Sequence, residues 1–145
     1  MNDNLQIKGI FRLSVFDAHS GKLLEEYEDR NLVVNGGRTA VTKLLGGDVA
    51  NRSITKISFG ANGTAPAAAD NAITGAFTKS LGTVSYPTIS SVKFDWTLEA
   101  SENNGMSIRE FGLLCNDNTL FARKTREVIS KNADTRLVGY WEITF

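Results

Sequence analysis

Residues 104–126 read NGMSIREFGLLCNDNTLFARKTR, two apolar runs on either side of Asn116, Asp117 and Asn118. Asn and Asp tolerate positive φ angles and bond to their own backbone, so these three residues suit a tight turn. The two runs therefore predict a β-hairpin with a short loop. Gly112 lies in the middle of the first run, where a missing side chain usually marks a bulge or a close backbone approach.

Other segments share the two-residue period of half-buried strands. The clearest runs from Ser91 to Ala100, where apolar and polar side chains alternate strictly. About seven strands with turns every ~8–12 residues predict an all-β protein, mainly an antiparallel β-sandwich or barrel with one short helix, in one domain over residues 1–145. The further strands are predicted at residues 5–17, 23–34, 54–59, 83–86 and 136–145.

The predicted helix covers residues 38–45, with Asn35 as a suitable N-cap and Gly46-Gly47 as a suitable stop. A helix of about ten residues is not stable alone, so we expect it to pack on a sheet or on a neighbouring subunit. Its apolar stripe, at helical spacing, consists of Ala40, Val41, Leu44 and Leu45.

The best-defined strands also predict which side chains form the core. Phe94 and Trp96 lie on the apolar face of one strand, and Phe111, Leu113 and Trp141 lie on those of two others. We expect these five side chains to share one core.

Residues 60–76 contain small side chains, one proline and no large apolar residue before Ile73. This composition is typical of a long loop. Loops beyond about 12–15 residues in a compact domain are usually functional or disordered. We therefore predict a mobile surface element outside the packed core, which becomes ordered only against a partner.

Charge and composition limit the classes of function. The 145 residues include 16 basic and 16 acidic ones, so no nucleic-acid partner is expected. No apolar run approaches the roughly 20 residues that span a bilayer, so no membrane insertion is expected. The segment Met1-Asn2-Asp3-Asn4 lacks the features of a secretory signal, and Cys115, as the single cysteine, has no intrachain disulfide partner. Both features predict folding in a reducing cytoplasm.

The sequence lacks the residue patterns of catalytic and metal sites. One histidine, His19, and one cysteine, Cys115, are too few for a zinc site, and no calcium-loop pattern occurs. His19 lies in a predicted turn and Cys115 in an apolar run, so we expect a solvated histidine and a core cysteine. Asp70 and Asp117 are predicted turn residues. We expect no enzyme activity, no catalytic residue, no metal and no cofactor.

Three charged or glycine-rich patterns fit structural roles better than catalytic or binding roles. The segment Asn35-Gly36-Gly37-Arg38 lacks the Gly-Lys-Ser/Thr ending of a phosphate loop. Acidic residues at 25, 26, 28 and 29 could supply the paired carboxylates of a glycosidase, but their neighbours indicate an exposed strand face. A basic run is typical of a solvated strand edge. It consists of Arg123, Lys124, Arg126 and Lys131.

Arg109 and Glu110 are adjacent and therefore face opposite sides of their strand, where each needs a partner on another strand or subunit. Together with the basic run and the long loop they define a candidate partner interface. Its predicted members are Arg109, Glu110, Arg123, Arg126, Asn62, Gly63 and Pro66.

Five short motifs occur in a fixed order along the chain: NLVVNGGR at 31–38, ISFG at 57–60, NGTAP at 62–66, IREFGLL at 108–114 and TLFAR at 119–123. This order resembles that in tail-associated structural proteins of bacteriophages, such as tail-fibre, collar and baseplate components, and in the related contractile injection machines. The resemblance implies a non-enzymatic structural subunit of such an apparatus. It also implies a homo-oligomer of three or six copies, contacts with other tail or baseplate proteins, and a place in the virion tail after assembly in the bacterial cytoplasm.

Two other functions compete with this interpretation. A carbohydrate-binding β-sandwich that recognises a host surface would need Trp96 or Trp141 to stack on sugar rings. Both lie on apolar strand faces, which favours core positions. A hydrolase is disfavoured by the scarcity of histidine and cysteine.

Overall fold

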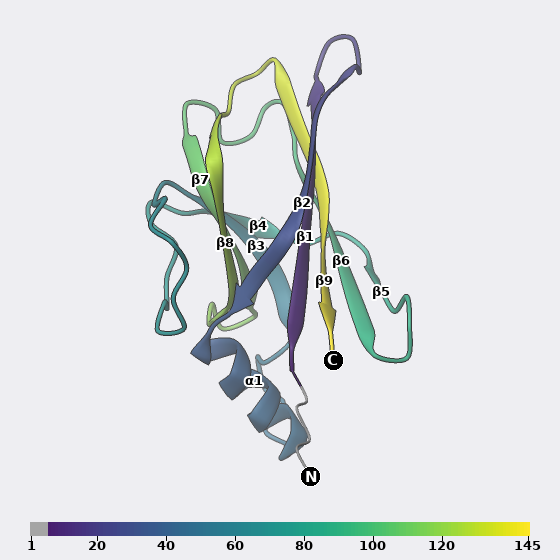
Figure 1. Cartoon of the computed structure of the whole chain (residues 1–145), viewed down its shortest axis with the longest axis vertical. Helices are drawn as coiled ribbons and strands as arrows, with labels where there is room; N and C mark the ends of the chain where they lie inside the picture. Colours follow the sequence, from purple (N-terminus) through teal and green to yellow (C-terminus); the bar gives the residue numbers. More distant parts are fainter. Residues whose placement is uncertain (1–5) are drawn as a thin grey trace.

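Nine β-strands and one α-helix form the fold in a computed structural model that describes residues 6–145 (Figure 1). The predicted all-β class with one short helix is confirmed. The predicted start of the first strand at Leu5 and the leader prediction for Met1–Asn4 lie outside the described residues. The elements are β1 (Lys8–Asp17), β2 (Leu23–Val33), α1 (Asn35–Leu45), β3 (Ile54–Gly60), β4 (Phe77–Ser80), β5 (Val84–Ser85), β6 (Ser91–Leu98), β7 (Ser107–Cys115), β8 (Leu120–Ser130) and β9 (Thr135–Thr144).

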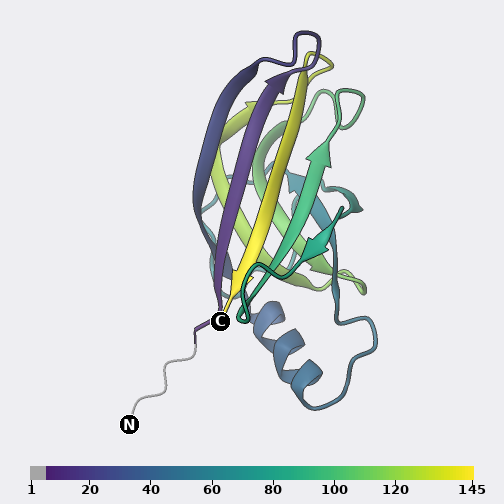
Figure 2. The same cartoon turned by 90° about the vertical axis from the view of Figure 1, so that its right-hand side faces the viewer.

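The strands form one curled antiparallel sheet, a half-barrel, in the order β4-β3-β7-β8-β2-β1-β9-β6-β5. Its two halves face each other as layers, and α1 lies at one end (Figure 2). β2 pairs with β1 along most of its length and reaches β8 only at Leu32 and Val33. On the opposite side, residues 81–83 join β4, which pairs with β3, to β5, which pairs with β6. β4 has no strand signal in the sequence, because Phe77 is its single apolar residue.

The predicted central hairpin is β7–β8, and Asn118 has the positive φ, 69°, that its turn requires. Two register shifts interrupt the hairpin, one between Ile108 and Glu110 and one between Leu113 and Leu114. Such bulges bend and twist a strand locally. β7 therefore follows the curl of the sheet.

Helix α1 begins at Asn35, and Val34 is the N-cap residue without a side-chain cap hydrogen bond. The predicted Asn35 cap is therefore wrong, whereas the predicted stop at Gly46 is confirmed. The first turn packs against β8: a Cβ on Gly36 or Gly37 would lie 2.4 or 2.3 Å from a carbonyl oxygen of that strand. The two glycines thus permit the close docking that a short helix needs.

The core lies between the two layers and is rich in aromatic rings. All five predicted core side chains are buried in one apolar cluster, which confirms the prediction. Phe11 is central to it, with ring centroids 5.7 Å from Trp96, 4.6 Å from Phe111 and 5.1 Å from Trp141. Offset and edge-to-face ring pairs of this kind add to the stabilisation from area burial.

Candidate partner interface

Two of the predicted interface residues, Glu110 and Arg123, meet beneath the loop between β3 and β4. Glu110 on β7 and Arg123 on β8 point to the outer face of the sheet, and Arg123 Nε donates to Glu110 Oε2 at 2.7 Å. Their side chains are 0% and 3% exposed. Asn62 and Gly63 belong to the loop that covers them. The ion pair is thus shielded from solvent by a segment of the same chain.

The ion pair between Glu110 and Arg123 holds the loop by hydrogen bonds to the loop backbone. Arg123 donates to the carbonyl oxygens of Asn62 and Thr64, both at 2.9 Å. Glu110 Oε1 accepts the N–H groups of Asn62 at 3.2 Å and Thr74 at 2.7 Å. Both ends of the loop are therefore fixed to one buried carboxylate. We call this network the loop anchor.

Asp70 completes the loop anchor. Its Oδ2 accepts from Arg123 Nη1 and from the Ala67 N–H, both at 2.9 Å. The Ala67 hydrogen bond, with Arg123 beside it, lowers the pKa of the Asp70 carboxyl below its usual value. The predicted turn role of Asp70 is confirmed, and its ionic role has no local sequence signal.

An apolar contact reinforces the loop anchor. Ile73 packs over Gly60 and Gly112, where a Cβ would lie within 2.4–2.7 Å of its side chain. Ile73 also joins a small cluster with Leu114 and Leu120. These contacts hold the loop within its own chain, and they argue against the prediction that it becomes ordered only against a partner. The predicted close approach at Gly112 is made by the Ile73 side chain.

The other predicted residues of this region lie at the surface, on the loop or on β7. Gly63 is exposed, Pro66 is half-buried, and Arg109 is exposed on β7 with its aliphatic stem against Gly63. These three are accessible to a partner. Glu110 and Arg123 are not, and they position the loop instead.

Arg126 lies apart, in a seam between β2 and β8 where these strands are not paired. Its Nη1 donates to Glu25 Oε1 at 2.6 Å, and its guanidinium lies 4.7 Å from the Tyr27 ring centroid. Lys124 bridges the same seam, donating to Asp29 Oδ2 at 2.6 Å. Ion pairs thus replace backbone pairing between these two strands. The Arg126 guanidinium already binds residues of its own chain, Glu25 and Tyr27.

The seam makes part of the stability dependent on pH. The Lys124 ammonium lowers the pKa of Asp29 below its ordinary value of 3.8. A lowered folded-state pKa contributes stability above the unfolded-state pKa, and this contribution is lost as the pH falls through the folded-state value. We expect the unfolding temperature of Asp29→Asn to fall less than that of wild type between about pH 5 and about pH 3. Calorimetry measures both slopes, and equal slopes would contradict the expectation.

The interpretation of the basic run as a solvated edge is wrong for three of its members. The exposed fraction of the whole residue is only 2% for Arg123, 8% for Lys124 and 2% for Lys131. Lys131 Nζ donates to Asn104 Oδ1 at 2.9 Å and to the Asn132 carbonyl at 3.0 Å. Burial lowers the pKa of Lys131. Buried cations need such partners, so these side chains are structural.

The residues considered for catalysis occupy the predicted environments. His19 is exposed in the β1–β2 turn, and its bond to Asp134 at 2.8 Å raises its pKa. Cys115 is buried in the core, and burial raises the pKa of its thiol to about 11. Trp96 and Trp141 are 1% and 0% exposed. Neither indole can stack on a sugar in this conformation.

An apolar groove of about 450 Å³ opens at the end of the sheet beside α1. Buried core side chains form its floor, namely Phe94, Phe121 and Ile143. Exposed side chains form its rim, namely Leu44, Val84, Tyr86 and Phe145. Exposed apolar patches with this composition are typical of protein contact surfaces.

No protein-family model matches this chain, and no curated protein or solved structure matches it significantly. Within residues 6–145, no helix is long and apolar enough to cross a membrane. The same residues contain no group of three or more His, Cys, Asp and Glu side chains arranged for a metal ion.

Proposed function

We propose that this protein is a non-enzymatic structural subunit of a phage-type tail or contractile injection apparatus. It acts through contacts with further copies of itself, three or six in a ring, and with other tail or baseplate proteins. In this proposal the protein is part of the virion tail once the particle is assembled. The observation that supports the proposal best is the anchored loop at 61–76.

The loop anchor fixes one conformation of a surface segment. A buried ion pair adds little net stability compared with apolar residues of the same size, because both charges lose water. Its value here lies in conformational specificity, since one guanidinium and one carboxylate hold four backbone groups. Loops held by a rigid scaffold commonly carry recognition, and preorganisation removes the entropy cost of ordering them on binding.

The exposed part of the loop is suited to close packing against another protein. Gly63, Ala65 and residues 67–69 are exposed and have small side chains. A partner can therefore approach the backbone closely. The apolar groove beside α1 offers a second contact surface on the same molecule. A subunit of a ring contacts its two neighbours through two different surfaces, so the presence of two separate surfaces supports the proposal.

Site-specific photocrosslinking tests the proposal. In bacteria that produce the particle, a photoreactive phenylalanine at Ala65 is expected to crosslink to a second copy or to another particle protein. The same residue at Lys22, exposed on the β1–β2 hairpin, serves as the control. Light scattering on the purified protein reports self-association independently.

The outcomes separate the alternatives. If Ala65 crosslinks to a different particle protein and the purified protein is a monomer, the structural role is supported and self-assembly is contradicted. Equal labelling from Ala65 and Lys22, with the chain absent from purified particles, would contradict the proposal.

A further inference from the structure

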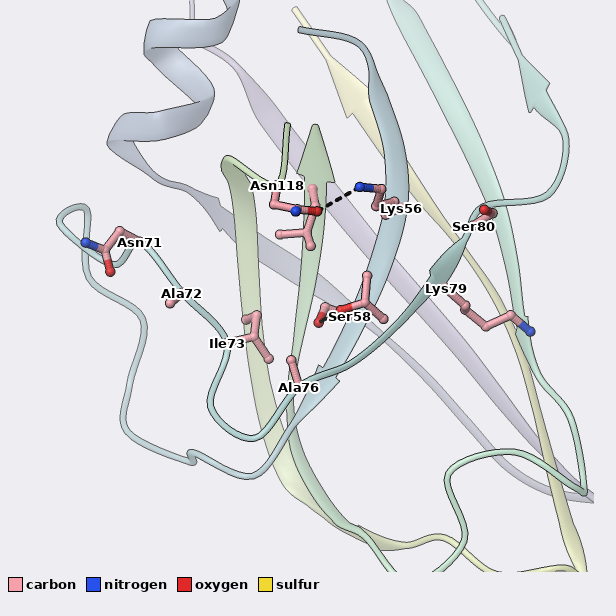
Figure 3. A pocket seen from close by; sticks show the side chains of 11 residues that line it. Lys56, Ser58, Asn71, Ala72, Ile73, Ala76, Lys79, Ser80 and Asn118 are labelled. Carbon is pink, nitrogen blue, oxygen red and sulfur yellow. Dashed lines mark hydrogen bonds between the residues drawn. The ribbon is translucent and has the colours of Figure 1, made fainter. Parts of the chain in front are cut away.

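A pocket of about 470 Å³ with one polar and one apolar side lies over the outer face of β3 and β4 (Figure 3). Alternate residues of a strand point to the same face, and the register places Lys56 opposite Ser80 and Ser58 opposite Thr78. Four polar side chains therefore form a two-by-two ladder on the pocket floor. Asn118, from the β7–β8 turn, closes one end.

The opposite wall of the pocket is apolar and comes from the anchored loop. Ile73 and the methyl groups of Ala72 and Ala76 line it (Figure 3). The loop anchor holds this wall in place, because Thr74 donates its N–H to Glu110 at 2.7 Å. The pocket thus combines hydrogen-bonding groups on one side with a fixed apolar surface on the other.

Lys56 gives the pocket an uncompensated positive charge. Its ammonium donates to Asn118 Oδ1 at 2.7 Å and to the Asn116 carbonyl at 3.0 Å, both neutral acceptors. Within residues 6–145 no carboxylate lies within ion-pair distance of Lys56, and no acidic residue lines the pocket. Lys79 also lines it, but its ammonium pairs with Glu102 at 2.6 Å and points away from the other side chains (Figure 3).

The hydroxyl groups present further donors. Ser58 is fully buried, and Thr78 is the partner of its hydroxyl at 2.8 Å. Either hydroxyl of this pair can donate to the other, and when Ser58 donates, the proton of exposed Thr78 is free for a ligand. Ser80 is exposed beside it. An ammonium and two hydroxyl groups therefore face the same space.

We propose that this pocket binds a small organic anion that carries a carboxylate next to hydroxyl groups, as hexuronic acids do. The carboxylate lies on Lys56, hydroxyl groups of the ligand meet Thr78 and Ser80, and an apolar ring face lies against Ile73. Pocket volumes of about 300–1,000 Å³ are usual for such ligands. Ligand binding at this pocket does not involve Trp96 or Trp141. The inference is also independent of the proposed structural role.

Calorimetric titration of the purified protein with glucuronate, glucose and acetate tests the chemistry. We expect saturable glucuronate binding at least about tenfold tighter than that of glucose or acetate. Added salt should weaken it, because the contact with Lys56 is ionic. Equal affinity for glucose and glucuronate, or no binding of glucuronate, would overturn the proposal.

Two variants locate the site. Lys56→Gln is expected to weaken glucuronate binding at least about tenfold, whereas Lys43→Gln, an exposed lysine on α1, should leave it unchanged. Thr78→Val keeps the shape of the side chain but removes its hydroxyl, which is also the partner of buried Ser58, and should weaken glucuronate binding several-fold. Unfolding temperatures verify that each variant is folded. Unchanged affinity in both Lys56→Gln and Thr78→Val would overturn the assignment.

A second titration of the purified protein uses a polymeric ligand, oligogalacturonate. Oligogalacturonate binding more tightly than the free acid, and with the same dependence on Lys56, would identify an acidic surface polysaccharide as the source of the ligand. Preference for the free acid would identify a soluble sugar acid.

Discussion

Replacing Arg123 by methionine is expected to lower the free energy of unfolding by about 3–5 kcal/mol. The substitution leaves Glu110 as an unpaired charge that is 0% exposed. It also removes the donors to Asn62 and Thr64 in the loop. Chemical denaturation measures the change, and a loss below about 1 kcal/mol would contradict the structural assignment of the loop anchor.

The matched control is Arg109→Met, which removes a cation of the same type from an exposed position of the neighbouring strand. It should change the free energy of unfolding by no more than about 0.5 kcal/mol. The double variant Glu110→Leu/Arg123→Met leaves no buried charge in this pair, so it should recover much of the lost stability. Hydrogen exchange at 61–76 should nevertheless rise in the double variant, because the loop has lost its anchor.

The double variant also connects stability with the proposed function. If the anchor serves recognition, crosslinking from Ala65 should fall in a protein that remains folded. Retained crosslinking with a freed loop would show that the partner contacts do not need the fixed conformation.

Local sequence pattern predicts most of the fold, because strands and the helix are set by residues near one another. The two-residue period from Ser91 to Ala100 corresponds to β6, and the helical spacing before Gly46 corresponds to α1. Of the four residues in the predicted apolar stripe of α1, however, only Ala40 is buried, and Leu45 is exposed. The loop anchor could not be predicted in this way. Glu110, Arg123 and Asp70 come from three segments, and their meeting depends on the path of the loop and on the register of β7–β8.

That register depends on one bulge. Leu114 lies opposite Leu120, so regular pairing would place Arg123 opposite Phe111, on the core face. The shift between Leu113 and Leu114 places Arg123 opposite Gly112 instead. A one-residue shift exchanges the two faces of a strand, so the bulge brings Arg123 to the outer face beside Glu110. Glu110 and Arg123 can be read from the sequence, but the bulge that places their side chains next to each other cannot.

Trp96→Ala is expected to lower the free energy of unfolding by about 3–5 kcal/mol, the usual range for deleting a buried aromatic side chain. Trp96 lies opposite Gly139 on β9, and a Cβ on that glycine would lie 2.4 Å from the indole. The indole thus occupies the space of the missing side chain. Its ring centroid is also 5.6 Å from that of Phe59 in the facing layer, so one side chain joins both layers.

Trp96→Phe separates packing from the indole N–H. The Trp96 Nε1 atom is buried without a hydrogen-bond partner among the described residues, so phenylalanine loses no hydrogen bond and keeps a ring over Gly139. We therefore expect Trp96→Phe to lose less stability than Trp96→Ala, with both measured by denaturant unfolding. Gly139→Ala should also destabilise, because its Cβ would collide with the indole and with the Arg12 carbonyl oxygen, 2.1 Å away. A loss below about 1 kcal/mol for Trp96→Ala would mean that the indole is exposed in solution. That result would reopen the possibility that Trp96 stacks on a sugar ring.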